Sequence, residues 1–316
     1  KNVKIFEQVF SKFTGFKYSV MVNSGSSANL LMFQSILYKK EYKNYLKKND
    51  EVIVPAVSWS TSYYPINQSG LKIKFVDIDK DTFNYDLDKL SKSITNKTKI
   101  ILLVSVLGNP NNISKIKELI KKKKRKILLL SDNCEALGAR YKMKHVGKES
   151  LISTFSSYFS HHISTIEGGI VCTDDKEIYH ILLSLRSHGW TRDLPKKNYV
   201  TKYKSKDEFK ETFNFVLPGY NLRPTEINAA AGIIQLKKID KFLKIRRLNS
   251  KYYKNFLNNN KYFNIQKEIE NSSWFGFSII LKSKYYKKFS KLRKNFKKIG
   301  IETRPIISGN FANQLV

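Results

Sequence analysis

The sequence predicts an α/β protein with a mostly parallel mixed sheet between helices, followed by a smaller α+β C-terminal domain. Three observations lead to this fold class. Short β-branched runs alternate with longer helical patterns, and the strand runs are apolar throughout, as expected for a sheet covered on both faces. A long helical pattern then introduces a new segment. The 316 residues, of which 41% are hydrophobic, suffice for a large core.

Seven segments have the strand pattern, and each is short and rich in β-branched or other apolar side chains. They are residues 18–24, 50–56, 73–79, 98–108, 125–132, 151–157 and 168–175. Functional sites in sheets of this kind lie just beyond the carboxyl ends of the strands. Polar or small residues at those ends are therefore candidate site residues.

Helical patterns separate and follow these strands. They cover residues 26–46, 113–125, 175–189 and 224–257, and the last leads to the segment "WFGFSIILK" at residues 274–282. We expect a large α/β domain over residues 1–235. A linking helix and a small, incomplete C-terminal domain are expected over residues 236–316.

The formal net charge of +32 is typical of proteins that bind nucleic acids. Here, however, the basic residues are spread over the whole chain, without zinc-finger spacing or an RNP-like aromatic motif. The densest run, Lys121–Lys126, follows an amphipathic pattern, where cations complement the negative end of a helix dipole. We therefore expect a solvated helix end and no nucleic-acid partner, although the charge would attract anionic substrates.

The chain has no run of about 18 apolar residues, and its start is an amphipathic pattern rather than a charged head followed by an apolar stretch. We therefore expect a cytoplasmic protein without a membrane partner. Its two cysteines, Cys134 and Cys172, cannot form a disulfide framework or, alone, a four-thiolate cluster. No metal site is expected.

Small polar residues follow the first predicted strand, in "NSGSSAN". Gly25, Ser26 and Ser27 could begin a helix with free backbone N–H groups, which would form an anion cradle. The alternative is an ordinary helix N-cap, which is the interpretation that the motif alone favours.

Other strand ends carry an aromatic ring and two carboxylates. Trp59 follows the second predicted strand and is either a core residue or a flat platform for a ligand. Asp132 and Glu135 follow the fifth strand, where burial of their charges is costly unless each meets a cation or a donor. An aspartate at this position would keep a heterocyclic ring nitrogen protonated.

Two of the five histidines are adjacent, in "FSSYFSHHISTIEGG" from Phe155 to Gly169. His161 and His162 lie in a segment of small and apolar residues, so the pair is either structural or chemical. An imidazole can take and give a proton near neutral pH.

The order of these motifs resembles the sugar aminotransferase family with the aspartate aminotransferase type I fold, and the similarity covers nearly the whole chain. It rests on "SGSSAN", "DEVIVPAVSWST", "KFVDID", "SDNCEALGA", "FSSYFSHHISTIEGG", "RSHGWTRDLPKK", "FVLPGYNLRPTEINAA" and "GIETRPI". The resemblance implies a fold type I enzyme whose large domain binds pyridoxal 5'-phosphate (PLP) or pyridoxamine 5'-phosphate (PMP).

In the aminotransferases of this family, the segment resembling "FSSYFSHH" carries a lysine at the position of His161, and that lysine binds PLP covalently. The replacement implies a noncovalent cofactor and a histidine that serves as acid and base. By resemblance, the chain is a PMP-dependent sugar 3-dehydratase, a lyase on a transaminase fold. It would remove the C3 hydroxyl of a GDP-linked 4-keto-6-deoxyhexose, with L-glutamate as amino donor, in the biosynthesis of the dideoxysugar colitose of surface polysaccharides.

The resemblance also implies roles for the other strand-end and loop residues. Asp132 would contact the cofactor's ring nitrogen, Trp59 its ring, and the partner subunit of a homodimer would supply a further phosphate contact. The full expected set is His161 as catalytic residue; Gly25, Ser26, Ser27, Trp59, Asp132, Glu135, Ser156 and Asn221 for the cofactor; and His188, Arg192 and Arg223 for the sugar nucleotide and glutamate.

Two rival enzymes share this scaffold. A PLP-dependent nucleotide-sugar 4-aminotransferase is the main alternative, and His161 argues against it because it replaces the covalent lysine. An iron–sulfur dehydratase acting on a CDP-linked sugar shares the histidine but needs more than two cysteines for its cluster.

Overall fold

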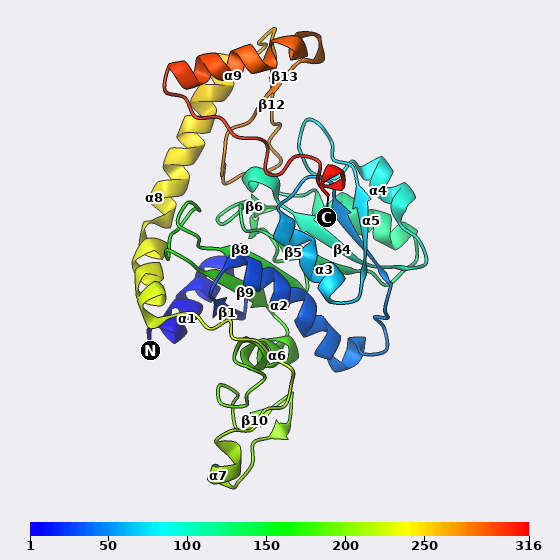
Figure 1. The fold of residues 1–316 in the computed structure, drawn as a ribbon, viewed down its shortest axis with the longest axis vertical. Coiled ribbons are helices and arrows are strands. Elements are labelled where there is room, and N and C mark those ends of the chain that lie inside the picture. The colour runs from blue at the N-terminus through cyan, green and yellow to red at the C-terminus, as the bar shows by residue number, and fades with distance from the viewer. Residues whose placement is uncertain (316) are drawn as a thin grey trace.

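The computed structural model describes residues 1–315, in which helices cover both faces of a central seven-stranded sheet (Figure 1). The strand order is β1-β9-β8-β5-β4-β2-β3. Only β9 runs against its neighbours, because it pairs antiparallel with both β1 and β8. The predicted mostly parallel sheet is confirmed.

Each strand of this sheet overlaps one of the seven predicted segments. The strands are β1 (Tyr18–Val22), β2 (Glu51–Pro55), β3 (Lys72–Val76), β4 (Thr98–Val104), β5 (Leu128–Asp132), β8 (Ile152–Ser156) and β9 (Gly169–Thr173). The predicted fourth strand was too long. It ends at Val104 because the 3₁₀ turn η3 (Val106–Gly108) follows, where Leu107 has a left-handed backbone (φ 54°).

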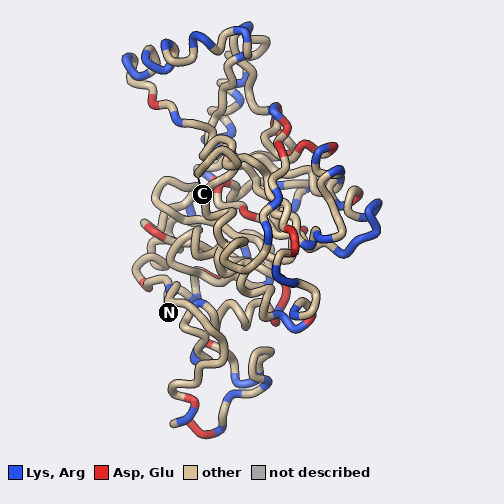
Figure 2. The backbone as a smooth tube through the Cα atoms, turned by 45° about the vertical axis from the view of Figure 1, so that its right-hand side comes forward, with Lys and Arg blue, Asp and Glu red and all other residues tan. Residues whose placement is uncertain are grey.

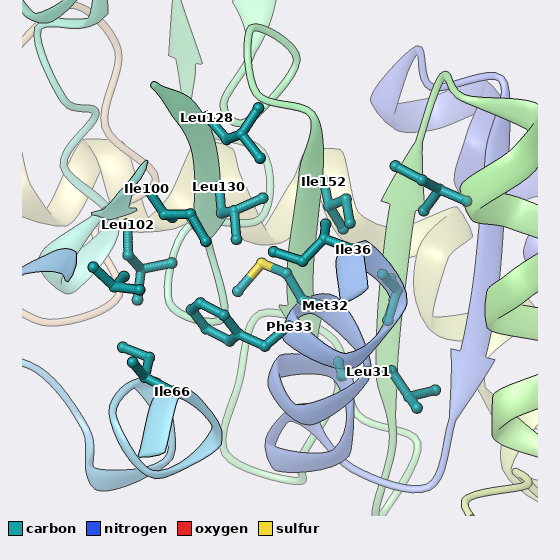
Figure 3. Packing of buried hydrophobic residues seen from close by; sticks show 14 of the residues in the cluster. Leu31, Met32, Phe33, Ile36, Ile66, Ile100, Leu102, Leu128, Leu130 and Ile152 are labelled. Atoms are coloured by element: carbon teal, nitrogen blue, oxygen red, sulfur yellow. The ribbon is translucent and has the colours of Figure 1, made fainter. Parts of the chain in front are cut away.

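One face of the sheet is covered by α2 (Gly25–Tyr38), α3 (Tyr64–Gln68) and α6 (Lys176–Arg186). Figure 3 shows Met32 and Phe33 of α2 among Ile100, Leu130 and Ile152, which come from three neighbouring strands. All five side chains are fully buried. Burial of apolar surface on this scale fixes α2 against the sheet, and thereby the position of its first residue, Gly25.

The other face is covered by two helix pairs. The helices α1 (Asn2–Thr14) and α8 (Glu226–Leu257) pack over β1, β9 and β8, where Phe6, Phe10 and Phe155 form an aromatic cluster. The helices α4 (Leu87–Ser93) and α5 (Ile113–Lys122) cover β2, β4 and β5.

The helix expected over residues 26–46 is shorter than predicted. It ends at Tyr38, because Lys39 adopts an extended backbone and its side-chain ammonium lies 2.8 Å from Asp175 Oδ2 and 3.3 Å from Glu177 Oε2. The 3₁₀ turn η1 (Lys40–Tyr42) follows. The helical pattern of apolar residues continues in the sequence beyond Tyr38, but the tertiary ion pairs of Lys39 favour the end of the helix there.

Two parts project from the central sheet and its covering helices in Figure 1. At one end, α8 leads to the C-terminal elements β12 (Phe263–Ile265), β13 (Ile279–Leu281), η4 (Ser283–Lys288), α9 (Phe289–Lys298) and η5 (Phe311–Asn313). The chain then returns to the sheet, where the N–H of Phe311 donates to the carbonyl of Ala56 at 2.8 Å. The expected division into residues 1–235 and 236–316 stays a prediction, and its boundary falls inside α8.

The opposite projection, which we call the arm, comprises residues 187–221. It contains β10 (Lys197–Asn198), β11 (Lys202–Tyr203) and α7 (Glu208–Glu211). A further small hairpin, β6 (Arg140–Tyr141) and β7 (Lys144–His145), follows β5.

Lysine and arginine residues are spread over the whole molecule (Figure 2). The run Lys121–Lys126 is exposed at the carboxyl end of α5, as predicted. Within residues 1–315, no helix has the length and apolar character needed to cross a bilayer.

Candidate active site

The carboxyl ends of β1, β5 and β8 meet at one edge of the sheet, together with the start of β9. Gly25, the first residue of α2, lies at this point. A Cβ atom on Gly25 would be 2.8 Å from Ser156 Cβ and 3.3 Å from Cys134 Sγ. Only glycine allows α2 to begin this close to the residues that follow β5 and end β8.

The first turn of α2 keeps free donors. Ser24 caps the helix by accepting a hydrogen bond from the N–H of Ser27 at 3.1 Å. The N–H groups of Gly25 and Ser26 have no acceptor in the described part of the chain. The helix start, with the buried hydroxyl of Ser156 beside it, is therefore suited to an anion such as a phosphate.

Asp132, the last residue of β5, is buried and held by three donors. Its Oδ2 accepts hydrogen bonds from Asn29 Nδ2 and Ser62 Oγ, both at 2.7 Å. Its Oδ1 accepts one from the N–H of Cys134 at 3.1 Å. All three donors are neutral. Because a buried carboxylate is costly without a cation, this site is prepared for a positively charged or N–H-bearing group.

Glu135 lies three residues beyond Asp132. Its Oε2 accepts a hydrogen bond from the N–H of Leu107 at 2.8 Å, which ties it to the turn after β4. Burial raises the pKa of Glu135 to about 7, and the negative charge of Asp132 adds to this shift. The carboxyl can therefore hold or release a proton near neutral pH.

His161 lies in the same site. Burial lowers the pKa of His161 to about 4, while the negative charge of Asp132 acts in the opposite direction. Its ring centroid is 5.0 Å from that of Phe275. Nδ1 is enclosed, and neither ring nitrogen has a hydrogen-bond partner within residues 1–315. The imidazole is therefore neutral at pH 7 and free to accept a proton.

His162 has different surroundings. Its side chain is 3% exposed, and Nε2 lies 3.2 Å from the carbonyl oxygen of Ser273. Burial lowers the pKa of His162 to about 3. Of the two adjacent histidines, His162 thus makes a core contact, whereas His161 belongs to the site.

Trp59 also lies near Asp132. The indole is 58% exposed and precedes the 3₁₀ turn η2 (Ser60–Ser62), whose last residue donates to Asp132. In the same turn, Thr61 Oγ1 accepts a hydrogen bond from Ser26 Oγ at 3.2 Å, which joins η2 to the start of α2. A ring bound at this edge would meet Trp59.

Four predicted residues lie apart from this group within the chain. Asn221 and Arg223 are exposed, and Arg223 Nε donates to Asn221 Oδ1 at 3.2 Å. His188 and Arg192 are exposed at the base of the arm, where the Arg192 guanidinium lies 5.2 Å from the centre of the Trp190 ring. No hydrogen bond or ion pair in the described chain joins these four to Asp132 or His161. Their expected roles stay predictions.

The sequence motifs did not identify several residues that contact the predicted ones. Asn29 and Ser62 donate to Asp132, and Asn29 is the last residue of the quoted "NSGSSAN". Phe275 packs on His161, and Arg246 Nη1 donates to the carbonyl oxygen of Phe275 at 2.9 Å. These residues come from distant parts of the chain, and only the polar character of Asn29 and Ser62 gave a sequence signal.

Residues 1–314 match the model of the DegT/DnrJ/EryC1/StrS aminotransferase family. The chain belongs to this family. The predicted resemblance is therefore confirmed.

Within the DegT/DnrJ/EryC1/StrS family, the chain is 53% identical over 309 residues to GDP-4-keto-6-deoxy-D-mannose 3-dehydratase of Escherichia coli O55:H7, covering 98% of this chain and 79% of that protein. It superposes with a TM-score of 0.96 on E. coli GDP-4-keto-6-deoxy-D-mannose-3-dehydratase with bound hydrated PLP, at 52% identity over 99% of this chain and 80% of that one. The same TM-score, identity and coverage relate it to a structure of GDP-4-keto-6-deoxymannose-3-dehydratase with a trapped PLP-glutamate geminal diamine. The predicted type I fold is confirmed.

Proposed function

We propose that this chain is a PMP-dependent dehydratase that removes the C3 hydroxyl of GDP-4-keto-6-deoxy-D-mannose, with L-glutamate as amino donor. One observation carries the proposal: a histidine, His161, shares the site with Asp132 where a covalent lysine would be expected. The segment around His161, residues 151–175, contains no lysine. The activity is that of the 53% identical relative, and glutamate is the amine in the trapped PLP adduct of the solved structure.

The residues present fit the cofactor. The free N–H groups at the start of α2, with Ser27 and Ser156 nearby, are suited to its phosphate. The uncompensated carboxylate of Asp132 is suited to its ring nitrogen, and the exposed indole of Trp59 to its ring. Glu135, fixed by Leu107, is close enough to Asp132 for their charges to interact.

When bound, PMP supplies an amine that condenses with the C4 ketone of the sugar and a conjugated ring that stores an electron pair. The chain supplies the proton transfers. His161 is neutral and accepts a proton at an unpartnered ring nitrogen. Once protonated, it delivers that proton to the C3 oxygen, which leaves as water because hydroxide is a poor leaving group.

The remaining predicted residues complete the proposal. Arg223 would bind the glutamate carboxylate in a bidentate manner, and His188 and Arg192 would face the sugar nucleotide. Asn221 would reach the phosphate of the neighbouring site, so the active form would be a homodimer. We also propose a cytoplasmic location, in the pathway to colitose.

The proposal is tested by incubating the purified protein with PLP, L-glutamate and a panel of GDP- and CDP-linked 4-keto-6-deoxyhexoses. A 3-deoxy sugar should form from the GDP-linked mannose derivative, with 2-oxoglutarate and ammonia as coproducts, in the presence of a chelator and without a reductase. A 4-amino sugar without loss of the C3 oxygen would instead indicate the aminotransferase alternative. Strict dependence on NADH and a reductase would also contradict the proposal.

A further inference from the structure

Asp132 is surrounded by buried polar side chains. We propose that Asn29 and Ser62 are positioning residues that hold Asp132 through Oδ2 and keep Oδ1 available for the ring N–H of the cofactor. This inference rests on the proposed use of PMP and deepens it, because it assigns the residues that orient the carboxylate toward the cofactor ring.

The number of acceptor positions supports this assignment. An ionised carboxylate offers about four lone-pair positions, two on each oxygen. Asn29 Nδ2 and Ser62 Oγ take both positions on Oδ2, each at 2.7 Å. The N–H of Cys134 takes one on Oδ1 at 3.1 Å. Oδ2 is therefore fully used by side-chain donors, whereas Oδ1 accepts from the backbone and lies near the Cys134 thiol, which is only a weak donor.

The orientation of Asn29 is fixed by a second bond. Its Oδ1 accepts a hydrogen bond from Thr154 Oγ1 at 2.6 Å. Because the Asp132 carboxylate only accepts, the amide nitrogen of Asn29 must face it, and the Thr154 hydroxyl then donates to the amide oxygen. Thr154 lies on β8 directly opposite Asp132 in the sheet register, and both Asn29 and Thr154 are fully buried.

The direction of the Ser62 bond is fixed as well. A serine hydroxyl has one proton, and Ser62 gives it to Asp132. Ser58 Oγ, 2.8 Å away, must therefore donate to Ser62. The carbonyl of Ser58 in turn accepts a hydrogen bond from Ser308 Oγ, on the segment that returns from the C-terminal elements.

These donors fix the orientation of Asp132. Asn29 belongs to α2 and Ser62 to η2, so two different elements hold Oδ2, and the carboxylate cannot rotate without breaking one of these bonds. Oδ1 is thereby kept available for the ring N–H. Loss of one donor leaves the carboxylate free to rotate.

The test compares two ligands on the full-length apoprotein: PMP, and 1-deaza-PMP, in which carbon replaces the ring nitrogen. Neither has an aldehyde, so neither reacts with surface lysines. Ser62→Ala should weaken PMP binding by up to about 10-fold, the size of one bond to a charged group, because a carboxylate no longer held by Ser62 can rotate away from the ring N–H. Binding of 1-deaza-PMP should change little, because it makes no bond to Asp132.

Asn29→Ala is the second, independent variant and should show the same preference. Ser131→Ala is the matched control, because Ser131 Oγ bonds Ser150 Oγ at 2.6 Å and is buried next to Asp132 without contacting it. Equal weakening of both ligands, or no weakening of PMP, would overturn the inference. If wild-type protein binds PMP no better than 1-deaza-PMP, the proposed cofactor contact itself fails, which is a different result.

Discussion

His161 and His162 are neighbours in sequence and both pack on Phe275, but their imidazoles differ in hydrogen bonding. His162 bonds the carbonyl of Ser273 from a buried position. His161 shares the contact with Phe275 but leaves its nitrogens without partners in the described chain. A neutral imidazole with free nitrogens is suited to proton transfer, whereas one bonded to a backbone carbonyl is suited to holding two segments together.

The first prediction concerns this division. His161→Asn keeps a polar side chain but removes the titrating nitrogen, so kcat should fall by about 10²-fold or more. The PMP dissociation constant should change little, because Asp132, Trp59 and the start of α2 are untouched. His162→Asn should keep most of the kcat and lower the midpoint of urea unfolding instead. Near-normal turnover in the His161 variant, together with loss of activity in the His162 variant, would reverse the two assignments.

The second prediction concerns pH. Burial lowers the pKa of His145 and His161 to about 4 and of His162 to about 3, from 6.5. The unfolded chain then binds more protons, so this stability is complete above about pH 6.5 and is lost as the pH falls toward 4. Burial raises the pKa of Glu135 to about 7 and also raises that of Glu7. These two groups bind more protons in the folded chain, so their contribution to stability decreases as the pH rises.

Burial also lowers the pKa of His180, and the four histidines outweigh the two glutamates, so the free energy of unfolding should be larger at pH 7 than at pH 5. Urea unfolding at both values measures the difference. His162→Gln should reduce the difference, because one of the four histidines no longer titrates. A protein that is equally stable at both values, with the variant unchanged, would show that the pKa of His162 in the folded state stays close to its unfolded value.

At the scale of single elements, the start of α2 depends on close packing against β8. Gly25→Ala would place a Cβ atom 2.8 Å from Ser156 Cβ, so the helix start must move. PMP should bind about 10-fold more weakly in a fluorescence titration, since the free N–H groups shift with the helix. Gly276→Ala is the control, because its Cβ would meet Leu107 Cδ2 at an ordinary 3.5 Å. Equal affinity in both variants would exclude the helix start from the site.

The helix α6 carries the residue that attaches the arm. Arg186 Nη1 donates to Glu7 Oε1 at 2.7 Å and to the carbonyl of Met21 at 2.8 Å, and its own carbonyl accepts from the N–H of Leu222 at 3.0 Å. Arg186 and Glu7 are both nearly enclosed. The Arg186 side chain therefore joins α6 to α1 and β1, and its backbone carbonyl binds the residue that follows the arm.

Arg186→Met should leave the Glu7 charge buried without its partner and lower the free energy of unfolding by about 3–5 kcal/mol. Lys210→Met removes an exposed pair with Asp207 and should have no measurable effect in the same urea titration. If both variants unfold like the wild type, the Arg186 pair is not a structural connection.

Local sequence patterns were sufficient for the strands but not for every helix end or for the full site. Asp132 and Ser156 could be placed because each ends a recognisable strand. The end of α2 could not, because an ion pair at Lys39 overrides helix propensity. Phe275 could not either, since its contact with His161 depends on how the C-terminal elements fold back over the sheet. The antiparallel direction of β9 likewise depends on tertiary pairing.

At the scale of the whole molecule, several large apolar side chains are exposed to solvent at a distance from the central sheet. They lie on the arm and at the start of α8: Tyr203, Phe209, Phe213, Phe215 and Ile227 are all more than half exposed. Exposed apolar side chains that lie close together typically mark interaction surfaces. Asn221 and Arg223 lie between these two elements, which is consistent with the proposed homodimer and with a role for Asn221 in the neighbouring site.

Mixed dimers test that role. His161→Asn disables the site of its own subunit, whereas Asn221→Ala should disable the site of the other subunit, and each homodimer should be nearly inactive at limiting PMP. In a heterodimer, one site then carries both defects and the other carries none. Random reassociation of equal amounts should therefore restore about a quarter of the wild-type activity. If Asn221 served its own subunit, both sites of the heterodimer would be defective, and mixing would give only the average of the two inactive proteins.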